Sequence, residues 1–189
     1  MVTRRVTLGR MRSIAPPTLC DGEVGVRPLA EGDVEAIVRA CADPEISRWT
    51  RVPQPYTPED ARRFIAVAAT EAAAGLSVAL AVTDDHGRLL GTVGLREVDR
   101  CAGRGEIGYW LAREARGRGA ATRAVRLLAD WAARELGLTR LEILAQTANA
   151  PSLRVAERAG FAPTGELRRV ERMPPGRRDG YAVHVWSPE

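Results

Sequence analysis

Residues 105–121 read GEIGYWLAREARGRGAA and combine the signals of three consecutive elements. The first part, Glu106 to Leu111, has the apolar and aromatic content of a β-strand. The turn RGRG follows at residues 116–119, and apolar residues then recur at helical spacing from Ala120 to Leu136. Gly137 is a typical helix stop. The stretch therefore predicts a strand, a glycine-rich turn and a helix.

This turn suits a phosphate group. The N-terminus of a helix presents unpaired N–H groups and a partial positive charge to whatever lies in front of it. Gly117 and Gly119 let a ligand approach the backbone closely, and Arg116 and Arg118 add positive charge that a pyrophosphate or a 3′-phosphate could use. A second interpretation stays open, in which the glycines only shape a tight turn between strand and helix.

Outside this stretch, the chain alternates between strand and helix patterns. Residues 57–60, TPED, are a strong helix start because a capping hydroxyl, a proline and an acid stand at the preferred spacing. The turn DDHG at residues 84–87 separates two β-rich runs and predicts an antiparallel hairpin. The patterns predict strands at 23–29, 77–83, 89–98, 106–111, 141–145 and 181–186, and helices at 33–42, 57–74, 120–136 and 151–159. Asp43 and Pro44 are expected to end the first of these helices.

This order of elements predicts a single-domain, mixed α/β (α+β) fold. A length of 189 residues fits one compact domain. We expect residues 21–189 to form that domain and residues 1–20 to be a flexible basic tail, because the start is Arg-rich and lacks the apolar run of a secretory signal. Residues 49–56 are interrupted by prolines and predict a loop.

Composition narrows the class of protein. No apolar run reaches the ~18 residues of a membrane span, so a cytoplasmic protein that binds no membrane is expected. Cys20, Cys41 and Cys101 lack metal-ligand spacing and there are only two histidines, so no metal is expected. The formal charge is +4, but the arginines are scattered among 24 acids. A nucleic-acid partner that uses residues 3–12 and 168–178 is therefore a minor alternative.

Two nucleotide-binding loops can be compared with the turn. All 28 basic residues are arginine, so the lysine of a phosphate loop is missing. A dinucleotide fingerprint fits Gly117 and Gly119, with Glu142 as the ribose-binding acid, but Thr122 stands at the third glycine position. The turn also follows an antiparallel hairpin, whereas that fold needs parallel βαβ units. The dinucleotide interpretation therefore ranks last.

Three motifs in the correct order resemble the GNAT acetyltransferases, and the RimJ/RimL branch in particular. They are residues 105–111 with 116–121, then NAPS at 149–152, then AGF at 159–161. The resemblance runs from about Val24 to Trp186. It implies a central, mostly antiparallel sheet flanked by helices, in which the strand at 106–111 splays from the strand at 141–145. It also implies transfer of an acetyl group from acetyl-CoA to a primary amine, without a covalent enzyme intermediate.

The resemblance also implies where acetyl-CoA binds. Backbone amides of the turn and the helix start would hold the CoA pyrophosphate, and pantetheine would lie in the splay. Backbone groups of Tyr109, Trp110 and Leu111 would face the thioester, where a free N–H could polarise the carbonyl. Asn149 would contact pantetheine or CoA, or simply cap the helix that follows. The residues expected to hold the pyrophosphate are Arg116, Gly117, Arg118, Gly119, Ala120 and Ala121.

Two catalytic side chains follow from the same resemblance. Glu106 matches the general base, a task that exists because an amine of pKa near ~8 to 10 is mostly protonated at neutral pH. The alternative for Glu106 is a strand-end acid paired with Arg96 or Arg104. Ser152 matches the residue suggested to protonate the CoA thiolate, or it is only a first-turn helix residue. Many GNAT members carry a Tyr for this step where this chain has Ala156.

The acceptor amine is left open by the sequence. Trp49, Arg51, Tyr56 and Tyr181 lie in segments that border the acceptor site in relatives, and they would suit a peptide N-terminus or a small amphiphilic amine. Plain packing is the alternative for each. A ribosomal or other protein N-terminus is one acceptor class of this branch. A catalytically weak, acyl-CoA-binding regulatory domain is the second functional hypothesis, and either a monomer or a homodimer fits.

Overall fold

A computed structural model describes residues 13–50, 52–169 and 180–188. The strands are β1 (Leu19–Cys20), β2 (Gly25–Pro28), β3 (Val78–Thr83), β4 (Leu89–Asp99), β5 (Arg104–Leu111), β6 (Arg140–Gln146), β7 (Ala162–Arg169) and β8 (Gly180–Trp186). The helices are α1 (Val34–Cys41), α2 (Pro44–Trp49), α3 (Pro58–Ala74), α4 (Ala120–Leu136) and α5 (Ala150–Arg158), with 3₁₀ turns η1 (Glu31–Asp33) and η2 (Arg113–Ala115).

The strands form one 8-stranded sheet in the order β1-β2-β3-β4-β5-β6-β8-β7. Every neighbouring pair is antiparallel except β5 and β6, which are parallel. The parallel pair is possible because the long connection through η2 and α4 returns the chain to the same end of the sheet. This confirms the predicted mixed fold and its mostly antiparallel sheet.

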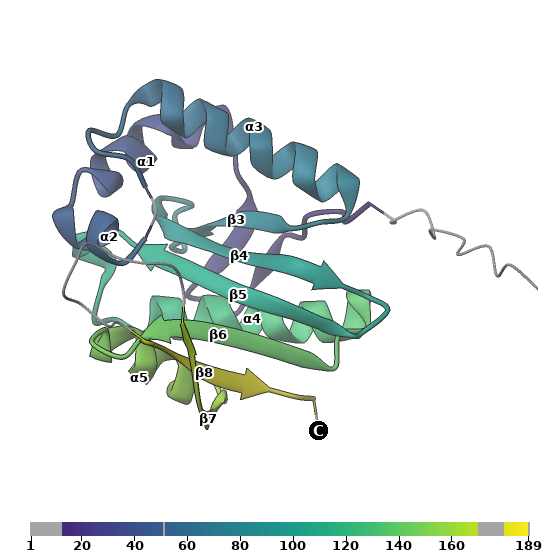
Figure 1. Ribbon diagram of the computed structural model, residues 1–189. Coiled ribbons are helices and arrows are strands. Elements are labelled where there is room, and N and C mark those ends of the chain that lie inside the picture. The colour runs from purple at the N-terminus through teal and green to yellow at the C-terminus, as the bar shows by residue number, and fades with distance from the viewer. Residues whose placement is uncertain (1–12, 51, 170–179, 189) are drawn as a thin grey trace, which may run out of the picture.

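Helices cover the two faces of the sheet unequally (Figure 1). In this view α4 lies behind the sheet, α3 runs along the top of the picture beside β3, and α1 and α2 lie at its left end. One apolar core joins α4 to the central strands through residues such as Val125, Leu128 and Ile107. A second, smaller core holds Ile37 of α1 and Ala61 of α3. In the orientation of Figure 1, the lower strands turn one face of the sheet toward the viewer without a helix over it.

The predicted helix signals act as expected at two positions. The Thr57 hydroxyl accepts from the Asp60 amide at 3.2 Å and the Asp60 carboxylate accepts from the Thr57 amide at 3.0 Å, so α3 begins with a capping box. Helix α4 ends at Gly137, whose φ of 69° is left-handed. The apolar face of α4 lies on the sheet because its periodic residues are the buried ones.

Three elements differ from the sequence prediction. Asp43 and Pro44 were expected only to end a helix. Instead, Asp43 caps a new helix, α2, and Pro44 is the first residue of that helix. Strand β7 was not predicted; it pairs with β8 at the edge of the sheet. Residues 13–20, predicted as part of the tail, pack on the domain, because Ile14 is buried and β1 pairs with β2. Residues 1–12 lie outside the described residues.

Candidate functional site

The parallel strands β5 and β6 pair only at their beginning. Their register contains Arg104 with Arg140, Gly105 with Leu141, and Glu106 with Glu142, and it ends there. Residues 107–111 of β5 pair with β4 on one side and have no partner on β6. We call the region beyond Glu106 and Glu142 the splay. The splay contains Tyr109, Trp110 and Leu111, whose backbone groups were predicted to face the thioester. The side chain of Trp110 packs against the smaller core and not on the side of the sheet that α4 covers.

Helix α4 begins beside the splay without a capping side chain. Gly119 is its N-cap with a φ of 82°, Gly117 has a φ of 77°, and the first turn holds no acid. Side-chain oxygens of Asp43, Thr57 and Asn149 cap the starts of α2, α3 and α5. The amides that open α4 therefore remain available to an external acceptor, and an anion is the ligand that suits them best.

The two arginines of the turn differ in their surroundings. Arg116 donates from Nε and Nη2 to the Leu111 carbonyl at 3.1 and 2.9 Å, and its Nη2 lies 2.8 Å from the Asp43 carboxylate. The Arg116 side chain is therefore bound to the end of β5 and to the start of α2, whereas the sequence suggested that its charge would serve a phosphate. Arg118 is exposed.

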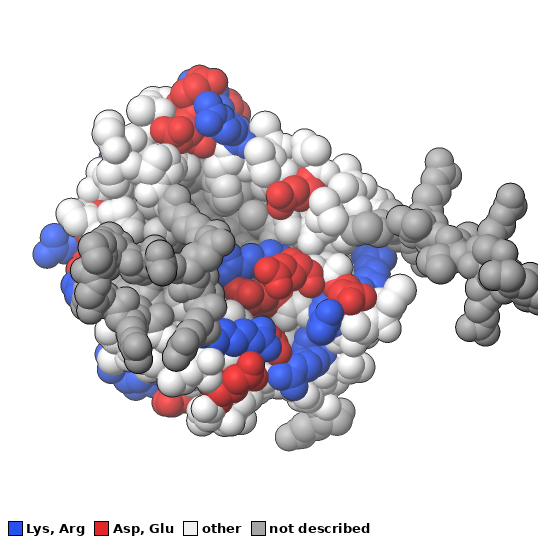
Figure 2. Space-filling model, in the orientation of Figure 1, with Lys and Arg blue, Asp and Glu red and all other residues white. Residues whose placement is uncertain are grey.

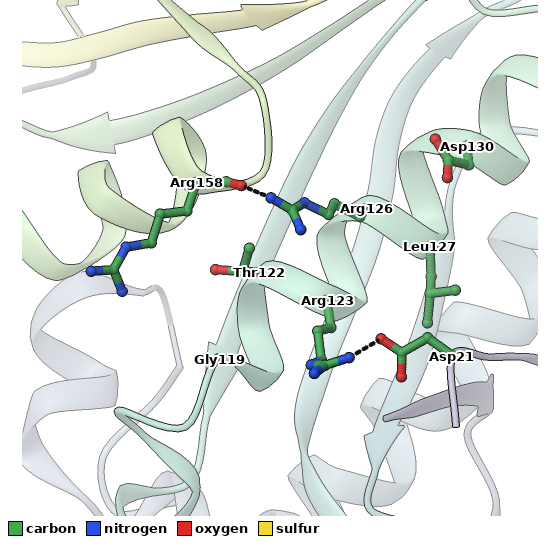
Figure 3. A pocket seen from close by; sticks show the side chains of 8 residues that line it. All are labelled: Asp21, Gly119, Thr122, Arg123, Arg126, Leu127, Asp130 and Arg158. Carbon is green, nitrogen blue, oxygen red and sulfur yellow. Dashed lines mark hydrogen bonds and ion pairs between the residues drawn. The ribbon is translucent and has the colours of Figure 1, made fainter. Parts of the chain in front are cut away.

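A hollow of about 550 Å³ lies along the first turns of α4 (Figure 3). Arg123 lies over one side, where it pairs with Asp21 at 2.9 Å. On the other side, Arg126 donates to the carbonyl of Arg158 at the end of α5. The hollow is lined by Asp21, Gly119, Thr122, Arg123, Arg126, Leu127, Asp130 and Arg158. It extends the uncapped helix start into a surface with several positive groups.

Glu106 and Glu142 lie side by side on the face of the sheet opposite α4. Arg96 donates to Glu106 from Nε at 2.9 Å and also from Nη2. Glu142 binds Arg140 and Arg168, with the nearest atoms 2.9 and 2.6 Å apart. Figure 2 shows such acidic and basic side chains interleaved on this face. The pairing of Glu106 with Arg96 is therefore present, whereas Arg104 lies 3.6 Å from Asp99 instead.

Ser152 is held from two directions at the start of α5. Its amide donates to the Asn149 side chain at 3.2 Å, so Asn149 acts as a helix cap. The Tyr109 phenol lies 3.0 Å from the Ser152 carbonyl and 2.9 Å from its hydroxyl. Burial raises the pKa of Tyr109 to about 12, against a smaller lowering by the Ser152 hydrogen bond, so the phenol stays protonated. Ala156 is fully buried in the core.

The predicted acceptor residues lie on different elements. Trp49 ends α2, where Arg48 stacks on its ring at 4.6 Å and its indole donates to Glu45 at 3.1 Å. Tyr56 precedes α3 and packs on the smaller core. Tyr181 on β8 accepts from Gln146 at 3.2 Å. Arg51 lies outside the described residues. Hydrogen bonds do not join these aromatic side chains to one another within the described part of the chain.

Two further findings concern the described residues as a whole. They contain no group of three or more His, Cys, Asp or Glu that could hold a metal ion. Among them, no helix has both the length and the apolar content needed to cross a membrane. The free thiols are an exposed Cys20, a buried Cys41 and an exposed Cys101.

Comparison with known proteins fits this geometry. The sequence model of the acetyltransferase (GNAT) domain matches residues 23–162, which include every element from β2 to α5. The chain belongs to the GNAT acetyltransferase family. The GNAT match contains the splayed strand β5, the glycine turn, α4 and the Asn149 to Ser152 segment, so the motifs that first suggested the family all lie inside it.

Individual proteins that are similar to this chain agree with the family assignment. The uncharacterized N-acetyltransferase p20 of Bacillus licheniformis is 29% identical over 160 residues, 82% of this chain and 88% of that protein. The putative ribosomal N-acetyltransferase YdaF of Bacillus subtilis (strain 168) is 42% identical over 82 residues, 43% of this chain and 45% of that protein. Mycobacterium smegmatis RimJ, solved with CoA-disulfide, shares the fold at a TM-score of 0.79 and 22% identity, over 94% of this chain and 88% of its own. By family, this GNAT chain is an N-acetyltransferase.

Two side-chain contacts of the site were not predicted from the sequence. Tyr109 was expected to contribute only its backbone, yet its phenol reaches Ser152, which stands 43 positions later. Asp43 was read as a helix stop, yet it binds Arg116 of the turn. Strand alternation places Tyr109 on the α4 side with Ile107, which is the one signal that could have pointed to its contact.

Proposed function

We propose that this GNAT chain transfers the acetyl group of acetyl-CoA directly to a primary amine, within a ternary complex. The uncapped start of α4 supports the proposal most strongly, because free amides, two left-handed glycines and the adjoining basic hollow suit the phosphates of CoA. The RimJ structure of the same fold was solved with CoA-disulfide, which agrees with CoA as the cofactor class.

The pyrophosphate would lie on the amides from Arg116 to Ala121. Pantetheine would then run into the splay, where β5 beyond Glu106 has lost its partner on one side. Backbone groups of Tyr109, Trp110 and Leu111 would face the thioester. A backbone N–H directed at the carbonyl oxygen would stabilise the negative charge that develops there during the attack.

Proton transfer would use two side chains. Glu106 takes a proton from the acceptor ammonium, directly or through water, and the neutral amine then attacks the thioester carbonyl and loses a second proton to solvent. The carbon–sulfur bond then breaks, and Ser152 supplies a proton to the leaving thiolate. The Tyr109 phenol, which is protonated at neutral pH, lies next to this donor and contacts the Ser152 hydroxyl. Solvent returns the proton to Ser152 and removes the one on Glu106, so each turnover yields amide and CoA thiol.

The acceptor is proposed as a protein or peptide N-terminus or a small-molecule amine. The relative YdaF carries the name of a putative ribosomal N-acetyltransferase, which favours a ribosomal-protein N-terminus as the first acceptor to test. Trp49, Tyr56 and Tyr181 stay candidate acceptor contacts. A cytoplasmic location follows from such an acceptor, and either a monomer or a homodimer would carry out the same transfer.

Initial rates measured against both substrates test direct transfer. Thiol release is followed while acetyl-CoA and a peptide bearing a free N-terminus are varied, and intersecting double-reciprocal lines are expected. Parallel lines would indicate a covalent acetyl-enzyme and would contradict the proposal. Glu106→Gln should lower turnover by about 10²-fold or more. Glu142→Gln is the matched control, because Glu142 lies in register with Glu106 and also binds arginine but has no proposed role.

The absence of a tyrosine at Ala156 favours a second candidate function. In this alternative the chain binds acyl-CoA and regulates another process without transferring the acetyl group. The two are distinguished by the same assay, since a purely binding domain would bind acetyl-CoA but release no thiol with any amine.

A further inference from the structure

Arg96 and Glu106 face each other directly across β4 and β5. Nε of Arg96 lies 2.9 Å from Oε1 of Glu106, and Nη2 binds the same oxygen. Oε2 receives no hydrogen bond from the residues that the structure describes. The guanidinium therefore binds one oxygen of the carboxylate and leaves the other without a hydrogen bond from these residues. By contrast, Arg27 binds both carboxylate oxygens of Asp33.

The two partners differ in their exposure to solvent. The Glu106 side chain is 10% exposed, whereas that of Arg96 is 61% exposed. Arg96 thus reaches the carboxylate from the open face of the sheet, where an acceptor would approach. A general base must present a free carboxylate oxygen to the amine in a defined orientation.

The pairing of β4 with β5 becomes irregular immediately after Arg96. The register between β4 and β5 shifts between Arg96 and Asp99, and Glu97 has a φ of 51°. Such bulges redirect side chains and are frequent next to active sites. A glycine, Gly108, lies two residues beyond Glu106 on the same face of β5, and a Cβ built there would lie 3.9 Å from the Arg96 guanidinium carbon. The guanidinium therefore extends along β5 toward the splay.

Other charged groups near Glu106 are already paired. Glu142 is its register neighbour on β6, and Arg140 on β6 and Arg168 on β7 bind Glu142. Within the described residues, Arg96 on β4 is thus the one cation bonded to Glu106.

We infer that Arg96 is the positioning residue of the general base: it holds Oε1 of Glu106 so that Oε2 is directed at the acceptor amine. This inference rests on the proposed function, in which Glu106 accepts the amine proton. Arg96 does not itself exchange a proton in this step, because its guanidinium stays charged throughout. Its contribution is the orientation of the carboxylate.

The test compares kcat and the KM for acetyl-CoA, measured separately, in wild-type protein, Arg96→Met, Arg96→Lys and Glu106→Gln. Arg96→Met keeps the apolar stem and removes the hydrogen-bond donors, so kcat should fall on the order of ten-fold. The KM for acetyl-CoA should change little, because Arg96 does not belong to the proposed CoA site. Arg96→Lys keeps one donor group and should restore part of the lost kcat.

Arg140→Met is the matched control, since Arg140 is also a half-exposed arginine bound to a strand glutamate on this face. It should leave both kcat and the KM unchanged. A wild-type kcat in Arg96→Met, with Glu106→Gln inactive, would overturn the inference alone. Full activity in Glu106→Gln would overturn the base assignment together with this inference. Melting temperatures of all variants separate these results from a loss of folded protein.

Discussion

The phenolic oxygen of Tyr109 lies 2.9 Å from the hydroxyl oxygen of Ser152 and 3.0 Å from the Ser152 carbonyl oxygen. The phenol has one hydrogen and two acceptors on the same residue. When it donates to the serine hydroxyl, the serine hydrogen is free to point elsewhere. The contact also joins β5 to the start of α5 on the far side of the splay, so it fixes the separation of the two proposed catalytic regions.

Tyr109→Phe should lower the turnover number by about three- to ten-fold, the worth of one hydrogen bond of ~0.5–1.5 kcal/mol. The KM for acetyl-CoA should change less, because the phosphate-binding region is untouched. In a Ser152→Ala background the same change should have little further effect on turnover. Equal losses in both backgrounds would show that the phenol does not act through the serine hydroxyl.

The three thiols should react at very different rates with a thiol reagent at pH 8. Burial raises the pKa of the Cys41 thiol to about 12, so almost no reactive thiolate forms there in the folded protein. Cys20 and Cys101 are exposed and should react promptly. We expect two fast equivalents, with the third appearing only in denaturant. Fast reaction of all three thiols would contradict the buried position of Cys41. It would also make a covalent mechanism with a cysteine nucleophile a candidate again.

Gly119→Ala and Gly137→Ala form a matched pair at the two ends of α4. Both glycines are left-handed, and a Cβ at either would meet no atom within 4 Å, so only backbone strain distinguishes alanine from glycine. Each variant should lose about 1–2 kcal/mol in the free energy of unfolding. Only Gly119→Ala should also weaken acetyl-CoA binding, which calorimetry would measure. Equal affinity in the two variants would argue against phosphate binding at the α4 start.

Asp33→Asn should reduce the free energy of unfolding at pH 7 by about 2 kcal/mol. Burial works to raise the pKa of Asp33, but hydrogen bonds from Arg27 and the Ala30 amide outweigh it and lower the pKa below 3.8. Stability from this carboxylate is therefore fully present above pH 3.8 and is lost as the pH falls through the lowered pKa. Urea melts should show the wild-type advantage shrinking below pH 4. An advantage that persists at pH 2 would exclude the ion pair as its source.

Local signals in the sequence were sufficient for most of the fold. The capping residues at 57–60, the hairpin turn at 84–87 and the apolar face of α4 each depend on neighbours within a few positions, and each is confirmed. Helix α2 was missed because a helix start at Asp43 looks like the end of the helix before it. Strand β7 was missed because APTGELRR is mostly polar, contains a left-handed Gly165 and is exposed along its edge.

In the candidate site, too, only the features that depend on neighbouring residues could be predicted from the sequence. The glycine turn could be recognised because it depends on one strand-to-helix connection. The contacts of Arg116 with Asp43 and of Tyr109 with Ser152 join residues that are far apart in the chain, and only the assembled fold brings them together. The choice of Arg96 over Arg104 as partner of Glu106 depends on strand register, which the sequence alone does not define.

Thermal unfolding with acetyl-CoA, CoA, NAD and no ligand tests the central claim, a CoA site at the start of α4. A ligand that binds only the folded state at ~100 times its Kd stabilises it by about 2.7 kcal/mol, which should raise the melting midpoint by about 5 °C or more. We predict this shift with acetyl-CoA and CoA and none with NAD. A shift with NAD alone, or no shift with either CoA ligand, would contradict the account.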